Sequence, residues 1–309
     1  MQKLTNLPAK APAHHMRANG GDRFFQGCIY LLTVIIAIVT VYPLIYALSA
    51  SLSKPLNIMN GSVWLWPVEL SFQAYKNVFA SKSIILGYGN TVYYAVVGTA
   101  INMVLSVMAA YPLSMPDIKG KNFVTILITF TMFFSGGIIP SYLNVRDLGL
   151  LNSRWSVMIP GAINATNMLI LRNYFIHSVP GELREAASID GCSAIGTMFK
   201  IVLPLSKSIL MVVMLYYTVS HWNSYFEAMM YLQKAQEKWP LQVHLRNILI
   251  MSQMGDMAEQ SGVDDVNTQL LYEALKYAII VVSAAPLLIL YPFVQRFFEK
   301  GIMMGSIKG

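Results

Sequence analysis

The stretch Glu185-Ala186-Ala187-Ser188-Ile189-Asp190-Gly191, followed by Ile201-Val202-Leu203-Pro204, is a short polar and amphipathic segment between long apolar stretches. Of the 309 residues in the chain, 55% are hydrophobic and only 12% are charged. Soluble domains carry about 25% charged residues, and about 20 consecutive apolar residues can cross a bilayer. Because backbone groups in lipid must pair within their own segment, such stretches form helices. The sequence therefore predicts an all-α, polytopic membrane protein in which this polar segment lies outside the lipid.

Six stretches have the length and composition expected of transmembrane helices. They are 27–51, 91–115, 123–139, 155–175, 208–230 and 274–293. Together they predict a six-helix domain, 27–298, between an N-terminal tail, 1–26, and a C-terminal tail, 299–309. Two connections within this domain are long: the polar segment 180–204, and the segment 231–273.

The distribution of charge predicts the orientation of these helices. The segments on the side of the N-terminus hold 13 basic and 6 acidic residues, whereas the opposite side holds 9 of each. The net charge of +7 therefore falls on one side. Because basic loops stay in the cytoplasm, we expect both termini and the segment 180–204 to be cytoplasmic. A nucleic-acid partner is the weaker explanation of the charge, since no basic run is interleaved with aromatic residues.

Two of the segments on the opposite, extracellular side are expected to contain helices. Apolar residues recur at helical spacing within 71–79, which predicts a short helix along the surface. Residues 241, 245, 248 and 249 form a similar amphipathic stripe inside the long connection 231–273. The second helix fits two compatible roles, a cap on the membrane surface and a docking element for an extracellular partner.

Within 180–204 the residues predict two short helices joined at a glycine. Pro180-Gly181 is a natural start for a helix over 182–189. Gly191 can adopt a positive φ, which ends that helix and turns the chain sharply. Ser193 is a plausible N-cap for a second helix, 194–199, and Pro204 closes the unit before the next apolar stretch.

The side chains of these two helices suit contact with another protein. Ala186 and Ala187 are small enough for a partner to approach closely, and Phe199 offers apolar area. Glu185 and Asp190 can form ion pairs with basic residues across an interface. The segment is therefore predicted to be a coupling surface.

This pattern resembles the EAA loop of the permease subunits of ATP-binding-cassette importers. The loop has Glu-Ala-Ala, a Gly a few residues on, and then Ile-x-Leu-Pro, all at the spacing found here. Asp190 and Phe199 match the form common in carbohydrate importers, while Cys192 stands where alanine is more usual. The resemblance continues in 171–175, in His221-Trp222-Asn223 and in 297–309, so it covers nearly the whole chain.

The resemblance implies a type I importer permease of the MetI-like fold, in a bacterial cell membrane. It implies a heterodimer with a second homologous permease, two ATPase subunits that bind ATP and Mg²⁺, and an extracellular solute-binding lipoprotein that delivers a carbohydrate. The residues expected to contact the ATPases are Glu185, Ala186, Ala187, Asp190, Gly191 and Phe199.

The chain itself is predicted not to be an enzyme and to hold no cofactor. It lacks the G-x-x-x-x-G-K-[ST] loop that cradles phosphates, as well as the G-x-S-x-G, HExxH and EF-hand patterns. Its two cysteines, Cys28 and Cys192, belong to no Cys/His cluster with zinc spacing, and we expect no disulfide. The pair His14-His15 is interpreted as a chance pair in the N-terminal tail.

Polar and aromatic residues inside the predicted spans are the candidates for the substrate path, because they are costly when they face lipid. Amides bond to sugar hydroxyls and aromatic rings stack on sugar rings, which suits a carbohydrate. For any single residue, hydrogen bonding between helices is the commoner role. The candidates are Asn164, Asn167, Tyr217, His221, Trp222 and Asn223, with Asn102, Tyr216 and Ser220 beside them.

Three other functions remain open as alternatives. A secondary transporter of a small polar solute would need inverted repeats and intramembrane acids, yet spans two to four contain no Asp or Glu in their cores. An intramembrane enzyme would need paired aspartates or a Ser/His pair in motif context, and neither is found. A scaffold without a transport role would leave the segment 180–204 unexplained.

Overall fold

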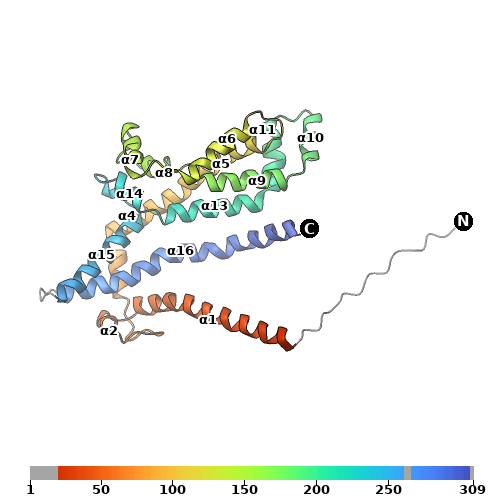
Figure 1. Cartoon of the computed structure of the whole chain (residues 1–309). Helices are drawn as coiled ribbons and strands as arrows, with labels where there is room; N and C mark the ends of the chain where they lie inside the picture. Colours follow the sequence, from red (N-terminus) through yellow and green to blue (C-terminus); the bar gives the residue numbers. More distant parts are fainter. Residues whose placement is uncertain (1–19, 261–265, 307–309) are drawn as a thin grey trace. The chain divides into compact units, whose positions relative to one another are not determined.

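The computed structural model describes residues 20–260 and 266–306 (Figure 1). Every regular element in those ranges is a helix, apart from an isolated antiparallel bridge between Ser53 and Leu70. The all-α prediction is thus confirmed. The predictions for His14-His15, for most of the N-terminal tail and for the end of the C-terminal tail lie outside the described residues.

The chain forms two compact units, 1–46 and 47–309. The described part of the first unit consists of helix α1 (Gly20–Ser51), which ends in the second unit. The hydroxyls of Thr33 and Thr40 donate to the carbonyls of Ile29 and Ile36, four residues earlier, at 2.8 and 2.7 Å. These polar side chains are therefore satisfied inside α1, as a helix in lipid requires, in agreement with the predicted span 27–51.

Two more helices are long and apolar enough to cross a membrane without a sharp bend. One runs from Lys82 to Ser114 and joins α4 (Lys82–Tyr93), the π-helical turn η1 (Tyr94–Gly98) and α5 (Thr99–Ser114). The other is α16 (Val266–Ser306), whose apolar part is Leu270–Pro292. They agree with the predicted spans 91–115 and 274–293.

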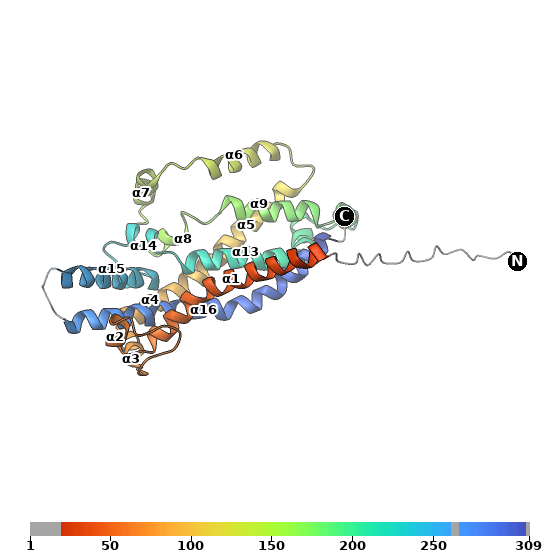
Figure 2. The same ribbon diagram turned by 60° about the horizontal axis from the view of Figure 1, so that its bottom comes forward.

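The predicted third span, 123–139, is wrong as a single helix. It consists of α6 (Lys121–Phe133) and α7 (Ile138–Asp147), whose axes differ by 117° (Figure 2). The link contains Gly137 with φ of +88°, a conformation that favours glycine, and Pro140 lies in the first turn of α7. The chain therefore turns where hydropathy alone predicted a continuous span.

The predicted fourth and fifth spans, 155–175 and 208–230, are also broken. The fourth contains α8 (Trp155–Met158) and α9 (Ala165–His177), separated at Pro160-Gly161. The fifth contains α13 (Lys207–Trp222) and α14 (Phe226–Tyr231), with an irregular link between them. Within residues 20–260 and 266–306, three unbroken helices are long and apolar enough to cross a membrane. The number rises to five if each of two bent pairs counts as one span, Lys121–Phe133 with Ile138–Asp147 and Ala194–Leu205 with Lys207–Trp222.

The short predicted helices are present in the structure. The segment after α1 contains α2 (Pro55–Met59) and α3 (Gln73–Ala80), and α15 (Leu241–Gln260) follows the short 3-10 helix η3 (Gln236–Lys238). The segment 180–204 contains α10 (Gly181–Ile189), α11 (Ala194–Thr197), a π-helical turn η2 (Met198–Val202) and α12 (Leu203–Leu205).

One part of the core lies where α5, α9, α13 and η2 meet. Ala110, Leu171, Phe175, Val202 and Val213 are fully buried there. α10 and α11 lie at one end of this bundle, whereas α8 and α14 lie towards the other (Figure 1). Because residues of η2 are part of the core, the polar segment 180–204 packs against the bundle.

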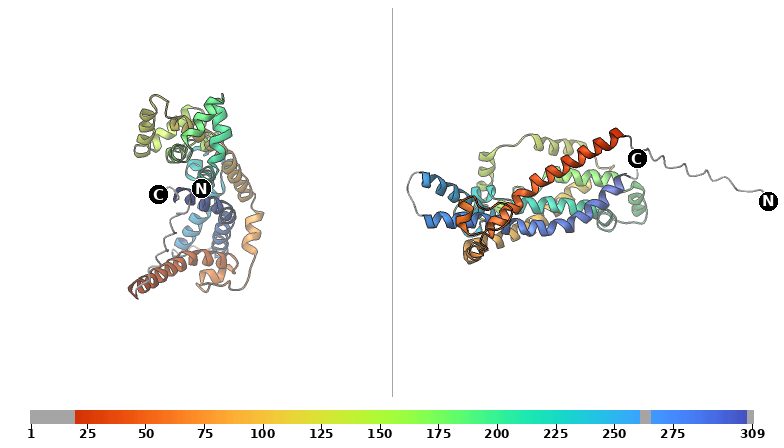
Figure 3. Two further views of the ribbon diagram at one scale, coloured as in Figure 1. Left: turned by 90° about the vertical axis from the view of Figure 1, so that its right-hand side faces the viewer. Right: turned by 90° about the horizontal axis from the view of Figure 1, so that it is seen from below.

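Two further parts of the core join the remaining helices. Val78 of α3, Leu241 of α15 and Ile279 of α16 are buried together. Near the other end of the bundle, Tyr94 of η1 and Met158 of α8 are completely buried beside residues of α14 and α15. α16 packs along α13 (Figure 3). Since lipid is as apolar as these side chains, close packing stabilises such contacts.

We predict that Gly87→Ala destabilises the protein, because α15 packs against Gly87 of α4 with no room for a Cβ atom. A Cβ at Gly87 would lie 2.6 Å from Cδ2 of His244 and 3.3 Å from the Leu241 Cα atom. Overpacking of this kind costs about 1–3 kcal/mol. The melting temperature in detergent should fall.

Gly89→Ala is the matched control in the same helix, because a Cβ at Gly89 meets no atom within 4 Å. Alanine is a better helix former than glycine by about 1 kcal/mol, so this variant should be neutral or slightly stabilised. Equal melting temperatures for the two variants would contradict the close packing.

Candidate functional site

The second unit contains a polar cavity of about 540 Å³ within the helical bundle. It is bounded by α5, by the link 159–164 between α8 and α9, by α13 and by residues 223–227. Amides, hydroxyls and aromatic rings make up most of the lining. The composition suits a ligand that offers many hydroxyl groups.

The cavity brings together most of the residues predicted for the substrate path. Those that line it are Asn102, Asn164, Asn167, Tyr216, Tyr217, Ser220, His221 and Asn223. Three helices, α5, α9 and α13, and two links contribute them, so the structure adds a proximity that sequence patterns could not show. Whether they contact a substrate remains a prediction.

Trp222 does not line this cavity, and its predicted place on the substrate path stays a prediction. Its indole Nε1 donates to the carbonyl of Ser283 on α16 at 2.9 Å, and its ring makes an edge contact with Tyr88. The side chain is only 5% exposed. Consecutive residues on a helix point about 100° apart, so Trp222 faces α16 while its neighbour His221 lines the cavity.

The irregular link 159–164 is held in place by side chains of α5 and α13. The Tyr217 hydroxyl accepts a hydrogen bond from the Asn164 backbone N–H at 3.1 Å and shares another with the Ser106 hydroxyl at 2.6 Å. Asn102 donates to the carbonyl of Gly161 at 3.4 Å. In membrane proteins, non-helical backbone is tolerated where it is buried in protein or lines a cavity, and this link lines the polar cavity.

Two further contacts fix the ends of this arrangement. The side-chain oxygen of Asn164 accepts from the backbone N–H of Asn167 at 3.1 Å and thereby caps the start of α9. His221 Nε2 lies 3.3 Å from Oδ1 of Asn102, and the ring packs so closely on Gly98 that a Cβ there would lie 2.5 Å from it. The polar residues therefore both line the cavity and hold its walls in place through their hydrogen bonds.

Sequence reasoning missed the lining contributed by 224–227, because these residues were assigned to the apolar fifth span. Glu227 accepts a hydrogen bond from the Ser224 hydroxyl at 3.2 Å. It is the acidic member of the lining, which includes no lysine or arginine among the described residues. A carboxylate at the end of an apolar stretch is the signal that could have indicated the break.

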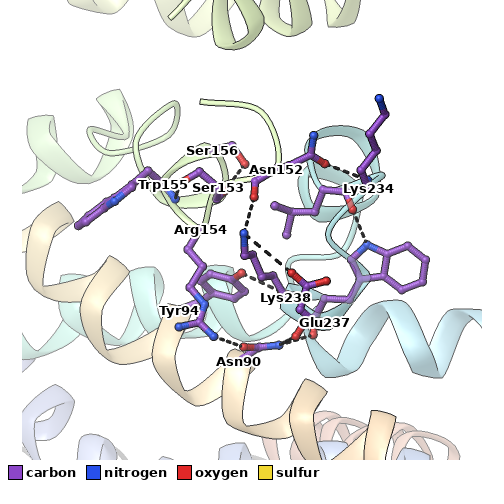
Figure 4. A network of polar contacts seen from close by, with 12 residues as sticks. Asn90, Tyr94, Asn152, Ser153, Arg154, Trp155, Ser156, Lys234, Glu237 and Lys238 are labelled. Carbon is purple, nitrogen blue, oxygen red and sulfur yellow. Dashed lines mark hydrogen bonds and ion pairs between the residues drawn. The ribbon is translucent and has the colours of Figure 1, made fainter. Parts of the chain in front are cut away.

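A polar network fastens the segment before α8 to the segment after α14 (Figure 4). Asn152, with φ of +59°, accepts from the Lys234 backbone N–H at 2.9 Å through its side-chain oxygen. The carbonyl of Asn152 accepts from the Nζ of Lys238 at 2.6 Å. This link joins two segments that are about 80 positions apart in sequence.

The same network reaches α4 through Asn90 (Figure 4). The Asn90 amide donates to the carbonyls of Glu237 and Trp239 at 2.8 and 3.1 Å, and its oxygen accepts from Arg154 at 3.0 Å. The Arg154 guanidinium lies 4.9 Å from the centre of the Tyr93 ring, within the range of a cation–π contact. The elements beside this end of the cavity are thus joined into one assembly.

At the other end of the bundle, the glycine turn of 180–204 has the predicted geometry. Gly191 has φ of +75°, and the N–H groups of Gly191 and Cys192 donate to the carbonyls of Ser188 and Ala187 at 3.1 and 2.8 Å. The Ser193 hydroxyl accepts from Gly196 N–H at 3.1 Å and caps α11. The sharp elbow between α10 and α11 is therefore set by local hydrogen bonds.

Most residues predicted for the coupling contact are accessible on this elbow. Glu185, Ala186, Asp190 and Gly191 are exposed, and Phe199 is 61% exposed. Ala187 is the exception, because it is only 6% exposed and packs within the chain. Its part in the predicted contact stays a prediction, and the burial of its side chain favours a packing role. The exposed side chains form a mixed apolar and acidic surface that this chain leaves uncovered.

Comparison with known proteins connects this architecture to a family. The binding-protein-dependent transport system inner membrane component family matches residues 16–304. This chain belongs to that family. Its function is therefore transport across a membrane as a permease subunit, and the alternatives of a secondary transporter, an intramembrane enzyme and a scaffold do not fit.

Several relatives cover almost the whole permease. The polygalacturonan/rhamnogalacturonan transport system permease protein YtcP of Bacillus subtilis is 41% identical over 93% of this chain and 99% of its own. Protein LplC of the same organism is 37% identical over 97% of this chain and all of its own. A chain from a solved bacterial ABC transporter involved in import of the acidic polysaccharide alginate has a TM-score of 0.81 at 37% identity. That similarity covers 91% of this chain and 98% of the solved one.

We predict that Tyr217→Phe makes the link 159–164 less stable, because it removes the hydroxyl group while the aromatic ring stays in the cavity. The change leaves the Asn164 N–H and the Ser106 hydroxyl without their partner, and such a loss costs about 1–3 kcal/mol. Hydrogen exchange of the link should accelerate, and the melting temperature should fall.

Tyr216→Phe is the control for this experiment, because Tyr216 lines the same cavity but is 45% exposed. It should exchange hydrogen at the rate of the unchanged protein. If the link 159–164 stays as protected from hydrogen exchange in Tyr217→Phe as in the unchanged protein, the hydrogen bonds of the Tyr217 hydroxyl do not stabilise it.

Proposed function

We propose that this chain is the permease subunit of an ATP-binding-cassette importer and that, with a second homologous permease, it forms the path for an oligosaccharide. The observation that carries this is the family match along 16–304 together with a cavity lined by amides, hydroxyls and aromatic rings. Amides hydrogen-bond to sugar hydroxyls, and aromatic faces pack on the apolar faces of sugars. The cavity of this chain would be one half of the path.

The substrate that we favour is an oligosaccharide released from an acidic polysaccharide. The names of YtcP and of the alginate transporter support this choice, since both polysaccharide classes contain uronic acids. No lysine or arginine lines the described cavity, and Glu227 does line it. We therefore expect this chain to recognise the hydroxyl groups of the cargo and the second permease to face its carboxylates.

The proposed orientation places both termini and the α10 end of the bundle in the bacterial cytoplasm. Two ATPase subunits, which bind ATP and Mg²⁺, would contact the exposed elbow through Glu185, Ala186, Asp190, Gly191 and Phe199. An extracellular solute-binding lipoprotein would deliver the cargo at the α8 and α14 end. Its docking would press on elements that the Asn90 and Asn152 network holds together.

Transport would follow from rigid-body movement. Closure of the ATPase dimer on ATP would displace the elbow, and the packed helices would move with it because cores adopt discrete arrangements rather than deform continuously. The cavity would open alternately towards the two sides as the permeases rock against each other. No covalent chemistry is required of this chain.

We predict that Glu185→Lys weakens ATPase association, because it reverses the charge on the exposed elbow. The fraction of ATPase subunits that co-purifies with the membrane complex should fall at least about tenfold, as expected when a charge pair at an interface becomes a repulsion. Membrane insertion should be unchanged.

The matched control is Glu69→Lys, the same charge change in the segment between α1 and α3. The pKa of the Glu69 carboxyl is lowered by its hydrogen bond and charge interaction with Lys54, but this contact is exposed and contributes little stability. Co-purification should stay at the unchanged level. A loss in both variants, or in neither, would contradict the proposed ATPase contact.

We predict that Tyr216→Ala raises the KM for oligosaccharide uptake about fivefold, since an aromatic contact contributes about 1 kcal/mol. Uptake should be measured in proteoliposomes that contain the assembled importer and its binding protein, with oligogalacturonides and with neutral arabino-oligosaccharides as cargo. Tyr291→Ala is the control, because Tyr291 is exposed on α16 and does not line the cavity. An unchanged KM in Tyr216→Ala would remove this residue from the path.

A further inference from the structure

Arg184 joins the elbow to the ends of two long helices of the bundle. It lies on α10, and its guanidinium donates to the carbonyl of Ser114 at 3.3 Å and to that of Phe175. Ser114 is the last residue of α5, and Phe175 lies in the last turn of α9. One side chain of the elbow therefore holds the ends of both helices.

The carbonyl end of α5 is well suited to bind cations. The last carbonyls of a helix have no partner within it and carry the negative end of its dipole. Pro116 prevents the helix from continuing. Carbonyls of 113–116 accept hydrogen bonds from three cations, Arg172, Arg184 and Lys121. Of these three, Arg184 comes from the elbow.

Direct packing between α10 and this helix end is interrupted by a cavity of about 630 Å³. Arg184, Glu185 and Ser188 of α10 line one part of it, whereas Tyr111 and Ser114 of α5 line another. This space therefore leaves α10 and the end of α5 without continuous side-chain packing at that point. The guanidinium hydrogen bonds cross the gap instead.

The second helix of the elbow has a different connection to α5. The Tyr111 hydroxyl donates to the carbonyl of Ala194 at 2.9 Å, and Met198 and Val202 of η2 pack into the core. α11 is therefore attached to α5 by packing and one neutral hydrogen bond, while Arg184 supplies the charged hydrogen bonds from α10 to α5 and α9. Burial lowers the pKa of the Arg184 guanidinium, yet arginine stays charged in proteins, so the connection persists over the physiological pH range.

We propose that Arg184 is a positioning residue that transmits movement of the α10 helix to α5 and α9, and through them to the polar cavity. The planar guanidinium serves this role because its several N–H donors bind two carbonyls in fixed directions. This inference rests on the proposed function, since it assumes that an ATPase moves the elbow. It adds the element that converts that movement into movement of the cavity walls.

The test compares Arg184→Met, Arg184→Lys and Arg172→Met in the complete importer, reconstituted in proteoliposomes with its ATPases and binding protein. Met has a side chain of similar length but no N–H donors, whereas Lys keeps the positive charge but lacks the planar guanidinium that can bind two carbonyls. Arg172→Met is the matched control. Arg172 lies on α9, donates to the Leu113 carbonyl at 3.0 Å and does not touch the elbow. Oligosaccharide uptake per ATP hydrolysed is the readout.

We expect Arg184→Met to retain the ATPases and basal ATP hydrolysis while uptake per ATP falls at least about tenfold, as the loss of two charge-assisted hydrogen bonds implies. Arg184→Lys should be intermediate, and Arg172→Met should match the unchanged importer in this ratio. An unchanged ratio in Arg184→Met, or an equal fall in Arg172→Met, would overturn the inference. If Arg184→Met fails to assemble, an unchanged ratio in Arg184→Lys overturns it and an intermediate ratio supports it.

A spectroscopic measurement separates transmission from stability. Spin labels at Ile189 on α10 and at Met108 on α5, both exposed, report the distance between these helices after Cys28 and Cys192 are replaced by serine. ATP should leave this distance unchanged in the otherwise unaltered importer and shift or broaden it in Arg184→Met. A distance that stays fixed in Arg184→Met would overturn the inference. Failure of the unaltered chain to bind an ATPase would instead overturn the proposed function.

Discussion

The structure depends on the requirement that every backbone polar group away from water has a partner. Long helices meet this requirement by themselves, as α1 does even for its threonine hydroxyls. The link 159–164 cannot, and it exists because Tyr217 and Asn102 supply hydrogen bonds from α13 and α5. The break that creates the polar cavity and the side chains that stabilise the break are therefore parts of one arrangement.

The two ends of the bundle meet the same requirement in different ways. Beside α8 and α14, Asn90 and Asn152 bind carbonyls and amides of segments that are far apart in sequence. At the α10 end, cationic side chains bind the free carbonyls of α5. At the first end the two asparagines link the segments, with Arg154 and Lys238 bound to them, whereas at the second end arginine and lysine side chains bind the free helix carbonyls directly.

Much of this could be predicted from the sequence, because composition and local turn chemistry act over short distances. The helical class, the elbow at Gly191 and the cap at Ser193 follow from residues close in the chain. The breaks in three predicted spans could not be placed, since hydropathy averages over the Pro and Gly that interrupt a helix. The burial of Trp222 and Ala187 could not be predicted either, because the direction in which each side chain points depends on how its helix is rotated against its neighbours.

The π-helical turn η1 has a consequence for how one long helix serves two neighbourhoods. One additional residue in a turn advances the face of the helix by about 100°. Before this turn, α4 packs on α3 and α15; after it, α5 packs on α6, α9 and α13. A single unbroken span is thus shared between two groups of helices. Because α13 contacts α4, η1 and α5, it connects the two groups along this span.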